Sequence, residues 1–347
     1  MRFPLSLTWS MTRYLAKQRL LRRKHFPLVL MLEPLHACNL RCTGCGRIRE
    51  YADSLDQRLS VDECLKAVED CGAPIVSICG GEPLIHPDIQ EIVEKILERG
   101  KPIYLCTNGQ LLVERLDRFK PSSRFYINVH LDGGPETHDA ITGKVGSYQK
   151  AIEGIEAAKK AGFLVYTNTT VYNQTTVDDL ERFMVDLTAL DIDGFMLSPG
   201  YGYAAVKDES SQDADEIFMT RERIKDVFRE ISERLSTFRL VTSPLYMEFL
   251  RGERKLDCAA WANPTYNTQG WKGPCYLMTD RPYETYRELI DQTDWDSLGF
   301  KEDCEVGEPQ GDPRCRHCMV HCGYEPAAVL FAKGIKDLAR MAIWQLT

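Results

Sequence analysis

Short apolar runs alternate with amphipathic segments from about residue 28 to residue 245. Apolar runs rich in β-branched and aromatic residues predict strands at residues 28–32, 74–79, 102–107, 125–131, 163–171, 194–198 and 238–242. Between them, apolar positions at a helical period predict helices beginning after Ser60 and over residues 87–98, 148–161, 176–189 and 221–235. Ser60 and Glu63 have the spacing of a capping box, which fixes the start of the first of these helices.

Repeated strand–helix units imply an α/β fold with a parallel sheet and right-handed crossovers. About six units predict a partial (β/α)6 TIM-like barrel with its site at the carboxyl ends of the strands. After residue 245 the chain becomes rich in Cys, Trp, Pro and Gly and loses its regular period. We therefore expect a basic amphipathic segment (1–27), a barrel (28–245) and a small Cys-rich C-terminal module (246–347).

Both ends of the chain have the pattern of basic amphipathic helices. Residues 5–24 contain six Lys and Arg, and one helical face gathers Leu7, Met11, Tyr14, Leu15 and Leu21. The last segment repeats the pattern with Ile335, Leu338, Ala339, Ala342, Ile343 and Leu346. Such helices either contact an anionic membrane surface peripherally or dock on the barrel, and the sequence leaves both interpretations open.

The composition is that of a globular protein, with 44% hydrophobic and 27% charged residues among 347. A net charge of −8 argues against a general nucleic-acid-binding protein. No apolar run is long enough to span a bilayer, and the N-terminus lacks a secretory signal. Thirteen cysteines without such a signal predict a reducing, cytoplasmic setting and metal ligation in place of disulfides.

Three cysteines follow the first predicted strand at a distinctive spacing. Cys38, Cys42 and Cys45 form a C-x3-C-x2-C loop, and three thiolates on one loop suit three irons of a [4Fe–4S] cluster. The fourth iron would stay open for a small molecule. A second loop, Cys79-Gly-Gly-Glu-Pro83, follows the next strand, where Gly80 and Gly81 permit a close backbone approach and Glu82 adds a carboxylate.

These two motifs together resemble the radical S-adenosylmethionine (SAM) superfamily. The resemblance implies that SAM binds the open iron through its amine and carboxylate, with Glu82 accepting from the ammonium. One electron from the cluster would then release a 5′-deoxyadenosyl radical. A zinc knuckle or a chance cluster is the competing interpretation of the three cysteines.

Other polar residues lie in or just after the predicted strands. Cys106 shares a strand face with Tyr104, so it is either a thiol near the radical or a small buried hydrophobe. Asn108, at the end of the same segment, is a candidate for contact with SAM. The other candidates for contact with SAM or substrate, each equally consistent with a satisfied interior polar group, are Asn128, His130, Asp132, Asn168 and Ser198.

The C-terminal cysteines suggest a second metal site. Cys258 and Cys275 precede a C-x2-C-x3-C motif formed by Cys315, Cys318 and Cys322. Four of these five thiolates would suit an auxiliary [4Fe–4S] cluster, similar to the modules of some radical SAM enzymes. A zinc site uses the same ligands. Spacing alone does not distinguish an iron–sulfur cluster, a zinc site and the absence of metal.

Nearly the whole chain resembles the adenosylhopane synthase family of hopanoid biosynthesis, most distinctively in residues 312–326. The resemblance implies that the adenosyl radical adds to the terminal alkene of diploptene, with Cys106 returning a hydrogen atom. It also implies a flavodoxin or ferredoxin as reductant and a hydrophobic triterpene as substrate. The alternatives are a radical SAM enzyme that abstracts hydrogen from a peptide or small metabolite, and a non-catalytic metal-binding scaffold.

Overall fold

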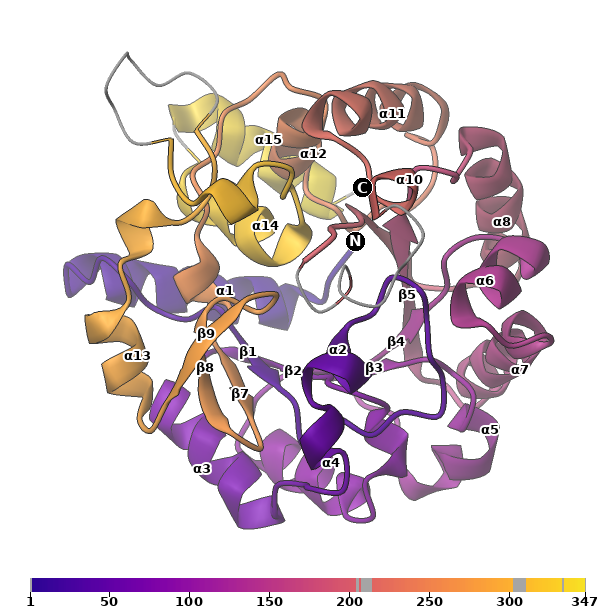
Figure 1. Cartoon of the computed structure of the whole chain (residues 1–347), viewed down its shortest axis with the longest axis horizontal. Helices are drawn as coiled ribbons and strands as arrows, with labels where there is room; N and C mark the ends of the chain where they lie inside the picture. The colour runs from indigo at the N-terminus through magenta and orange to yellow at the C-terminus, as the bar shows by residue number, and fades with distance from the viewer. Residues whose placement is uncertain (1, 204–205, 207–213, 302–309, 333, 347) are drawn as a thin grey trace.

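The structure is a computed structural model that describes residues 2–203, 206, 214–301, 310–332 and 334–346. Six parallel strands lie in chain order and curve into a partial barrel (Figure 1). They are β1 (Val29–Leu32), β2 (Ile75–Ile78), β3 (Ile103–Thr107), β4 (Phe125–His130), β5 (Leu164–Val171) and β6 (Gly194–Pro199). The predicted α/β barrel is confirmed, with strand bounds that differ by one or two residues.

Helices cover the outer surface of these strands (Figure 1). The main crossovers are α3 (Val61–Cys71), α4 (Ile89–Glu98), α7 (Ser147–Lys160), α8 (Val177–Ala189) and α11 (Arg221–Arg234). Ser60 and Glu63 form the predicted capping box at the start of α3. The remaining helices are α1 (Leu5–Leu20), α2 (Arg47–Glu50), α5 (Leu112–Arg115), α6 (Pro135–Thr142), α10 (Ala214–Ile217), α12 (Pro244–Leu250), α13 (Tyr286–Gln292), α14 (His321–Leu330) and α15 (Gly334–Leu346).

The prediction of a five-residue strand at residues 238–242 is wrong, because only one residue of this segment pairs as a strand residue. Only a single parallel bridge, from Phe195 to Leu240, joins this segment to β6. The extended run stops because the Ser243 hydroxyl accepts a hydrogen bond from the backbone N–H of Tyr246, and Pro244 begins α12. The segment therefore closes the barrel edge over one residue pair only.

The Cys-rich part of the chain continues the same sheet. Strand β7 (Thr265–Asn267) pairs in parallel with β1, and β8 (Gly270–Pro274) and β9 (Thr279–Tyr283) follow it in antiparallel pairing. The hydrophobic core is also continuous, because Ala259, Trp261 and Tyr324 belong to the same buried cluster as the strand residues. The division at residue 245 stays a prediction.

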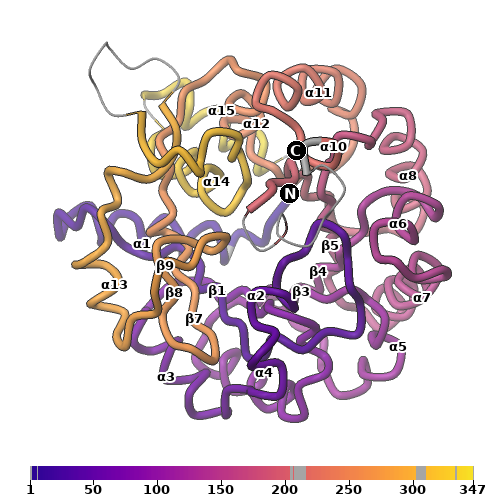
Figure 2. Tube along the Cα trace, in the orientation of Figure 1, coloured from indigo at the N-terminus to yellow at the C-terminus, as the bar shows by residue number. Residues whose placement is uncertain are grey.

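Helix α1 covers the amino end of the barrel. Leu7 is buried there against Ile75, Tyr126, Tyr166 and Val241, which fill the interior at the start of the strands. The two ends of the chain meet beside this layer (Figure 2), where the Arg2 N–H donates to the Gln345 carbonyl at 3.0 Å. Across the described part of the chain, no helix has the length and apolar character needed to traverse a bilayer.

Candidate active site

The predicted cysteine loop lies at the carboxyl edge of the barrel, between β1 and α2. Cys38, Cys42 and Cys45 are all reduced and half-buried. The Asn108 amide, just after β3, donates to the Cys38 sulfur at 3.6 Å and to the side-chain oxygen (Oδ1) of Asn39 at 2.8 Å. Burial raises the pKa of the Cys38 thiol to about 11 and raises that of Cys42 further. These thiols therefore need a bound cation to become thiolates at neutral pH.

The two glycines after β2 are required by the cysteine loop itself. A Cβ atom at Gly81 would lie 2.0 Å from the Ala37 carbonyl oxygen, and one at Gly80 would lie 2.5 Å from the Leu35 oxygen. Gly80 also has a φ of +103°, which side chains rarely adopt. The sequence suggested a close approach to a ligand, whereas the close approach in the structure is to the backbone that leads into the cysteines.

Glu82 is fully buried and links this glycine loop to the end of β3. Its carboxylate accepts from the backbone N–H groups of Leu84 at 3.0 Å and Asn108 at 2.8 Å, and from the Thr107 hydroxyl at 2.8 Å. Burial raises the pKa of Glu82 to about 7, against the lowering effect of these hydrogen bonds. The carboxylate thus positions Asn108 against Cys38, and its contact with a SAM ammonium stays a prediction.

Cys106 faces the barrel interior from the middle of β3. Its sulfur lies 3.4 Å from the Ser77 hydroxyl on β2 and 3.7 Å from the Asn128 amide on β4. Tyr104 lies two residues nearer the amino end on the same face of β3. Its ring stacks on that of Tyr126, with ring centroids 4.7 Å apart. Burial raises the pKa of Cys106, so its sulfur keeps a proton at neutral pH.

A histidine–carboxylate pair occupies the end of β4. The His130 ring lies 2.7 Å from Asp132, which is fully buried and also accepts from the Thr170 N–H at 2.8 Å. Burial disfavours protonation of His130, but the ion pair with Asp132 outweighs it and raises the pKa of the imidazole. Half-buried Asn168 is paired in register with His130 on β5. Asp132 therefore holds His130 in place, and His130 and Asn168 share one polar edge.

Ser198 lies on the next strand, β6, paired in register with Thr170, at the junction of the barrel with the Cys-rich part. Its hydroxyl accepts from the His321 N–H at 3.2 Å, where α14 begins. The side chain is buried, so the structure supports the interpretation of Ser198 as a satisfied interior polar group.

Five C-terminal thiols line one cavity, together with Tyr201, Tyr276 and Met278. They come from separate turns and helices and are Cys258, Cys275, Cys315, Cys318 and Cys322. Burial is the main cause of the raised pKa of each of the five. Cys304 lies outside the described residues. The described residues contain no three His, Cys, Asp or Glu side chains already arranged to hold a single metal ion.

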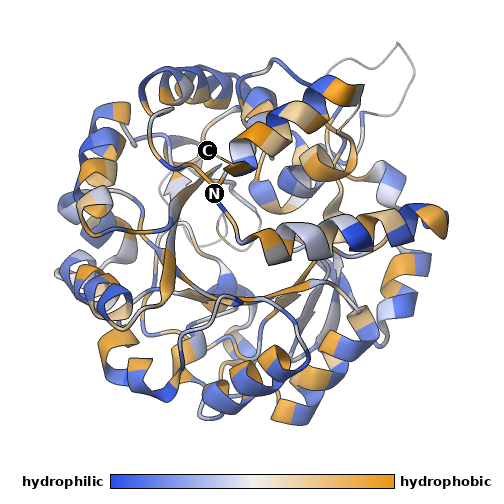
Figure 3. Ribbon diagram, turned by 180° about the vertical axis from the view of Figure 1, so that it is seen from behind, coloured by the Kyte–Doolittle hydropathy of each residue, from blue (hydrophilic) through white to orange (hydrophobic). Residues whose placement is uncertain are grey.

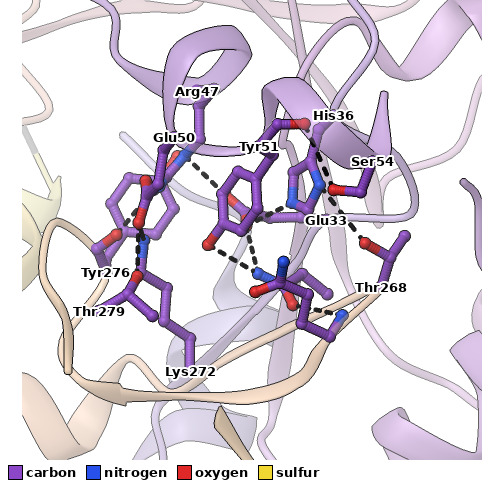
Figure 4. Close-up of polar contacts among 12 residues, drawn as sticks. Glu33, His36, Arg47, Glu50, Tyr51, Ser54, Thr268, Lys272, Tyr276 and Thr279 are labelled. Atoms are coloured by element: carbon purple, nitrogen blue, oxygen red, sulfur yellow. Dashed lines mark hydrogen bonds and ion pairs between the residues drawn. The ribbon is translucent and has the colours of Figure 1, made fainter. Parts of the chain in front are cut away.

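A buried ion pair that the sequence analysis did not identify flanks the cysteine loop (Figure 4). Glu33, which directly follows β1, binds the Arg47 guanidinium at 2.9 Å, and both side chains are almost fully buried. His36 lies 3.5 Å from the same carboxylate, and Asn267 on β7 donates to it at 3.4 Å. The available signal was a carboxylate placed directly after an apolar strand.

Arg47 extends this network toward the second set of cysteines (Figure 4). It donates to Glu50 at 2.8 Å and to the Tyr276 carbonyl at 2.7 Å, and it lies over the Tyr276 ring at 4.2 Å. Lys272 on β8 binds Glu50 at 2.8 Å. Since Tyr276 directly follows Cys275, the network connects the two cysteine sites through the interior.

Comparisons with known proteins agree with this geometry. Residues 32–187 match the family described as the radical SAM superfamily, and residues 195–341 match a domain of unknown function, DUF3463. The AdoMet-dependent heme synthase of Methanosarcina barkeri is 30% identical over 240 residues, covering 67% of this chain and 66% of that protein.

The chain belongs to the radical SAM superfamily. Enzymes of this superfamily use a [4Fe–4S] cluster and SAM. The GTP 3',8-cyclase of Aquifex aeolicus is 32% identical over 46% of this chain and 53% of its own length. The chain therefore spans only about half to two thirds of these curated relatives.

Solved structures of radical SAM enzymes share the fold. Streptococcus suis SuiB bound to its precursor peptide SuiA has a TM-score of 0.65 and 16% identity, over 87% of this chain and 78% of SuiB. anSMEcpe with bound AdoMet and the Cp18Cys peptide has a TM-score of 0.58 and 14% identity, over 92% of this chain and 97% of that one. At these identities the likeness is one of fold.

Replacing Glu33 with Gln tests the buried ion pair in this radical SAM protein. Burial opposes ionisation, but Arg47 outweighs it and lowers the pKa of Glu33 from 4.5 to about 2. The carboxylate therefore contributes its stability above the unfolded pKa and loses it as the pH falls toward 2. We expect urea unfolding of the metal-free variant to show a loss of about 3 kcal/mol near pH 7 that narrows to about 1 kcal/mol near pH 3.

Glu69→Gln is the matched control, because Glu69 pairs with Arg99 on the surface at 3.0 Å. Exposed pairs contribute little, so this variant should lose less than about 1 kcal/mol. Equal losses in the two variants, or a Glu33→Gln deficit that does not change with pH, would contradict the account of Glu33.

Proposed function

We propose that this protein is a radical SAM transferase that adds the 5′-deoxyadenosyl group of SAM to the terminal alkene of a hopene such as diploptene. The proposal starts from the resemblance of nearly the whole chain to adenosylhopane synthases. Its structural support is the interior thiol of Cys106, because addition leaves a carbon radical that needs a hydrogen atom.

In this proposal Cys38, Cys42 and Cys45 hold the cluster that binds SAM. When bound, the cluster supplies the single electron that cleaves the sulfonium bond of SAM, taken in turn from a flavodoxin or ferredoxin. Asn108 donates toward the Cys38 sulfur, which favours its thiolate form. The fixed positions of Gly80, Gly81 and Glu82 hold Asn108 and the loop in register. His130, Asn128, Asp132 and Asn168 supply the polar edge that faces the nucleoside.

The hydrogen balance defines the role of Cys106. The adenosyl radical forms one C–C bond with the terminal alkene carbon, and the unpaired electron moves to the adjacent tertiary carbon. The Cys106 S–H bond then breaks to form the new C–H bond, and the resulting thiyl radical regains an electron from the flavodoxin or ferredoxin and a proton from water. Ser77 and Asn128 fix the sulfur on one side, so one face of the radical receives the hydrogen.

An apolar cluster beside the cysteine loop supports a hydrophobic substrate. Tyr172, Tyr203 and Phe218 are buried together, with Cys42 and Leu277 packed against them. A triterpene would need such an apolar lining close to the point where SAM is cleaved. We accordingly propose a neutral, carbon-rich substrate in place of a charged one.

We further propose that the five C-terminal thiols bind an auxiliary [4Fe–4S] cluster. They converge on one cavity, and their raised pKa values mean that bound metal must displace their protons. Arg47 and Lys272, in the network beside Cys275, would offset the negative charge that thiolates acquire. Free thiols and clusters of this kind favour a reducing cytoplasm.

The relatives support a second candidate, hydrogen abstraction from a different substrate. The heme synthase and GTP cyclase names describe other reactions, and SuiB is bound to a peptide. An abstracting enzyme releases 5′-deoxyadenosine, whereas adduct formation retains the adenosyl group in the product. The fate of the adenosyl group therefore separates the two candidates.

Anaerobic incubation of the reconstituted protein with SAM, reductant and diploptene tests the proposed reaction. Mass spectrometry should detect an adduct of one adenosyl group and one triterpene, with methionine formed in equal amount. Cys42→Ala should give neither adduct nor SAM cleavage. Release of 5′-deoxyadenosine equal to the SAM consumed, with no adduct, would overturn the proposal in favour of abstraction.

The Cys106→Ala variant should still form the C–C bond, because addition precedes hydrogen transfer. In deuterated water the wild-type thiol exchanges its hydrogen, so the product should carry one deuterium with a single configuration. The variant should lose about tenfold or more in yield, or give both configurations, as stray donors reach either face. Cys64→Ala, which changes a buried cysteine on α3, is the control. A deuterated, single-configuration product formed at the wild-type rate would exclude Cys106 as the donor.

A further inference from the structure

Helix α15 turns its apolar face outward. Ile335 is 86% exposed, Leu338 59%, Ile343 61% and Leu346 61%, and Ala339 and Ala342 lie on the same exposed face. The inward face mixes apolar and polar contacts. Met341 packs against the core and Trp344 against Phe3. Asp337 binds Arg254 at 2.7 Å, and the Gln345 amide donates to the Phe3 carbonyl at 2.7 Å. These contacts hold the helix and leave the opposite, apolar stripe uncovered.

Helix α1 adds a second exposed stripe beside the first. Its predicted apolar face does dock on the barrel through Leu7, with Met11 packed against the same cluster. Leu5, Trp9 and Leu20 lie on the opposite face and are 58%, 66% and 84% exposed. We call this surface, formed by Leu5, Trp9, Leu20, Ile335, Leu338, Ile343 and Leu346, the terminal face.

The two helices form one surface at the amino end of the barrel. Gln345 of α15 donates to the Thr8 hydroxyl of α1 at 2.9 Å, and Phe3 packs edge-on against Trp344. Figure 3 shows both helices on the side seen from behind, whereas the loop around α2 lies in front in Figure 1. The terminal face is thus on the opposite side of the molecule from the cysteine loop. Exposed large apolar side chains gathered on two neighbouring helices are typical of an interaction site.

The positive charges around the terminal face indicate which partner it binds. Residues 1–32 contain seven Lys and Arg and no Asp or Glu, in a chain whose net charge is −8. Arg13 and Lys17 are exposed on α1, Arg22 and Arg23 are exposed just after it, and Lys336 is exposed on α15. A two-fold dimer through this face would bring the same positive charges together. Anionic lipid headgroups would neutralise them while the apolar side chains enter the interface.

We propose that the terminal face binds the surface of an anionic lipid bilayer. Trp9 suits the headgroup region, where an aromatic ring meets both apolar and polar surroundings. Docked in this way, the protein would turn the cysteine loop toward water and leave it accessible to a soluble reductant. This inference rests on exposure and charge, and it holds whichever substrate the enzyme uses.

Flotation of the full-length protein with vesicles tests the proposal. We expect binding to phosphatidylcholine vesicles that contain phosphatidylglycerol, little binding to phosphatidylcholine alone, and release as salt rises. The Ile335→Ser/Leu338→Ser/Ile343→Ser variant should bind at least about tenfold more weakly. Arg13→Gln/Lys17→Gln should weaken binding by roughly fivefold for each charge removed, the equivalent of about 1 kcal/mol.

Matched changes elsewhere serve as controls. Val113, Val145 and Val185 are 52%, 95% and 55% exposed outside the terminal face, so the triple Ser variant should bind as the wild type does. Lys120→Gln/Lys144→Gln is the charge control. Absence of vesicle binding, equal binding to neutral vesicles, or equal losses in the controls would each overturn the proposal. So would a dimer in solution that the α15 variant dissociates without any vesicle binding by the wild type.

Discussion

The ion pair between Glu33 and Arg47 holds the two ends of the cysteine loop together inside the protein. Glu33 directly follows β1, and Arg47 is the first residue of α2. The 2.9 Å contact between them therefore fixes the two ends of the loop that carries Cys38, Cys42 and Cys45. Two charges removed from water are costly unless their hydrogen-bonding capacity is used. Here Asn267 donates to Glu33, and Arg47 donates to Glu50 and to the Tyr276 carbonyl.

The same network joins residues of the barrel to residues of the Cys-rich part. Lys272 and Asn267 belong to the strands that extend the sheet beyond β1, and both reach the charges around Arg47. Cys275, which lines the cavity of the five C-terminal thiols, directly follows β8. We therefore expect a change in either charged partner to affect both cysteine sites, because Arg47 contacts Tyr276, which lines the C-terminal cavity.

The sequence predicted what depends on local patterns. Strands β1 to β6, the capping box at Ser60 and the strand face that Cys106 shares with Tyr104 follow from periodicity and short-range chemistry. The contacts of Arg47 with Tyr276 and of Glu50 with Lys272 join residues more than 200 positions apart, so no local pattern contains them. The apolar face of α15 was visible in the sequence, but the sequence could not show that Asp337 and Gln345 would turn that face outward. A helical period shows which residues share a face, but it does not show what packs against that face.

The central claim is that two separate cysteine sites, joined by one buried network, each hold a cluster. Iron content and electron paramagnetic resonance of the anaerobically reconstituted protein test it most directly. We expect about eight irons per chain in the wild type. We expect about four irons both in Cys38→Ala/Cys42→Ala/Cys45→Ala and in Cys315→Ala/Cys318→Ala/Cys322→Ala, with distinct spectra for the two variants. About four irons in the wild type, or zinc in the C-terminal site, would contradict it.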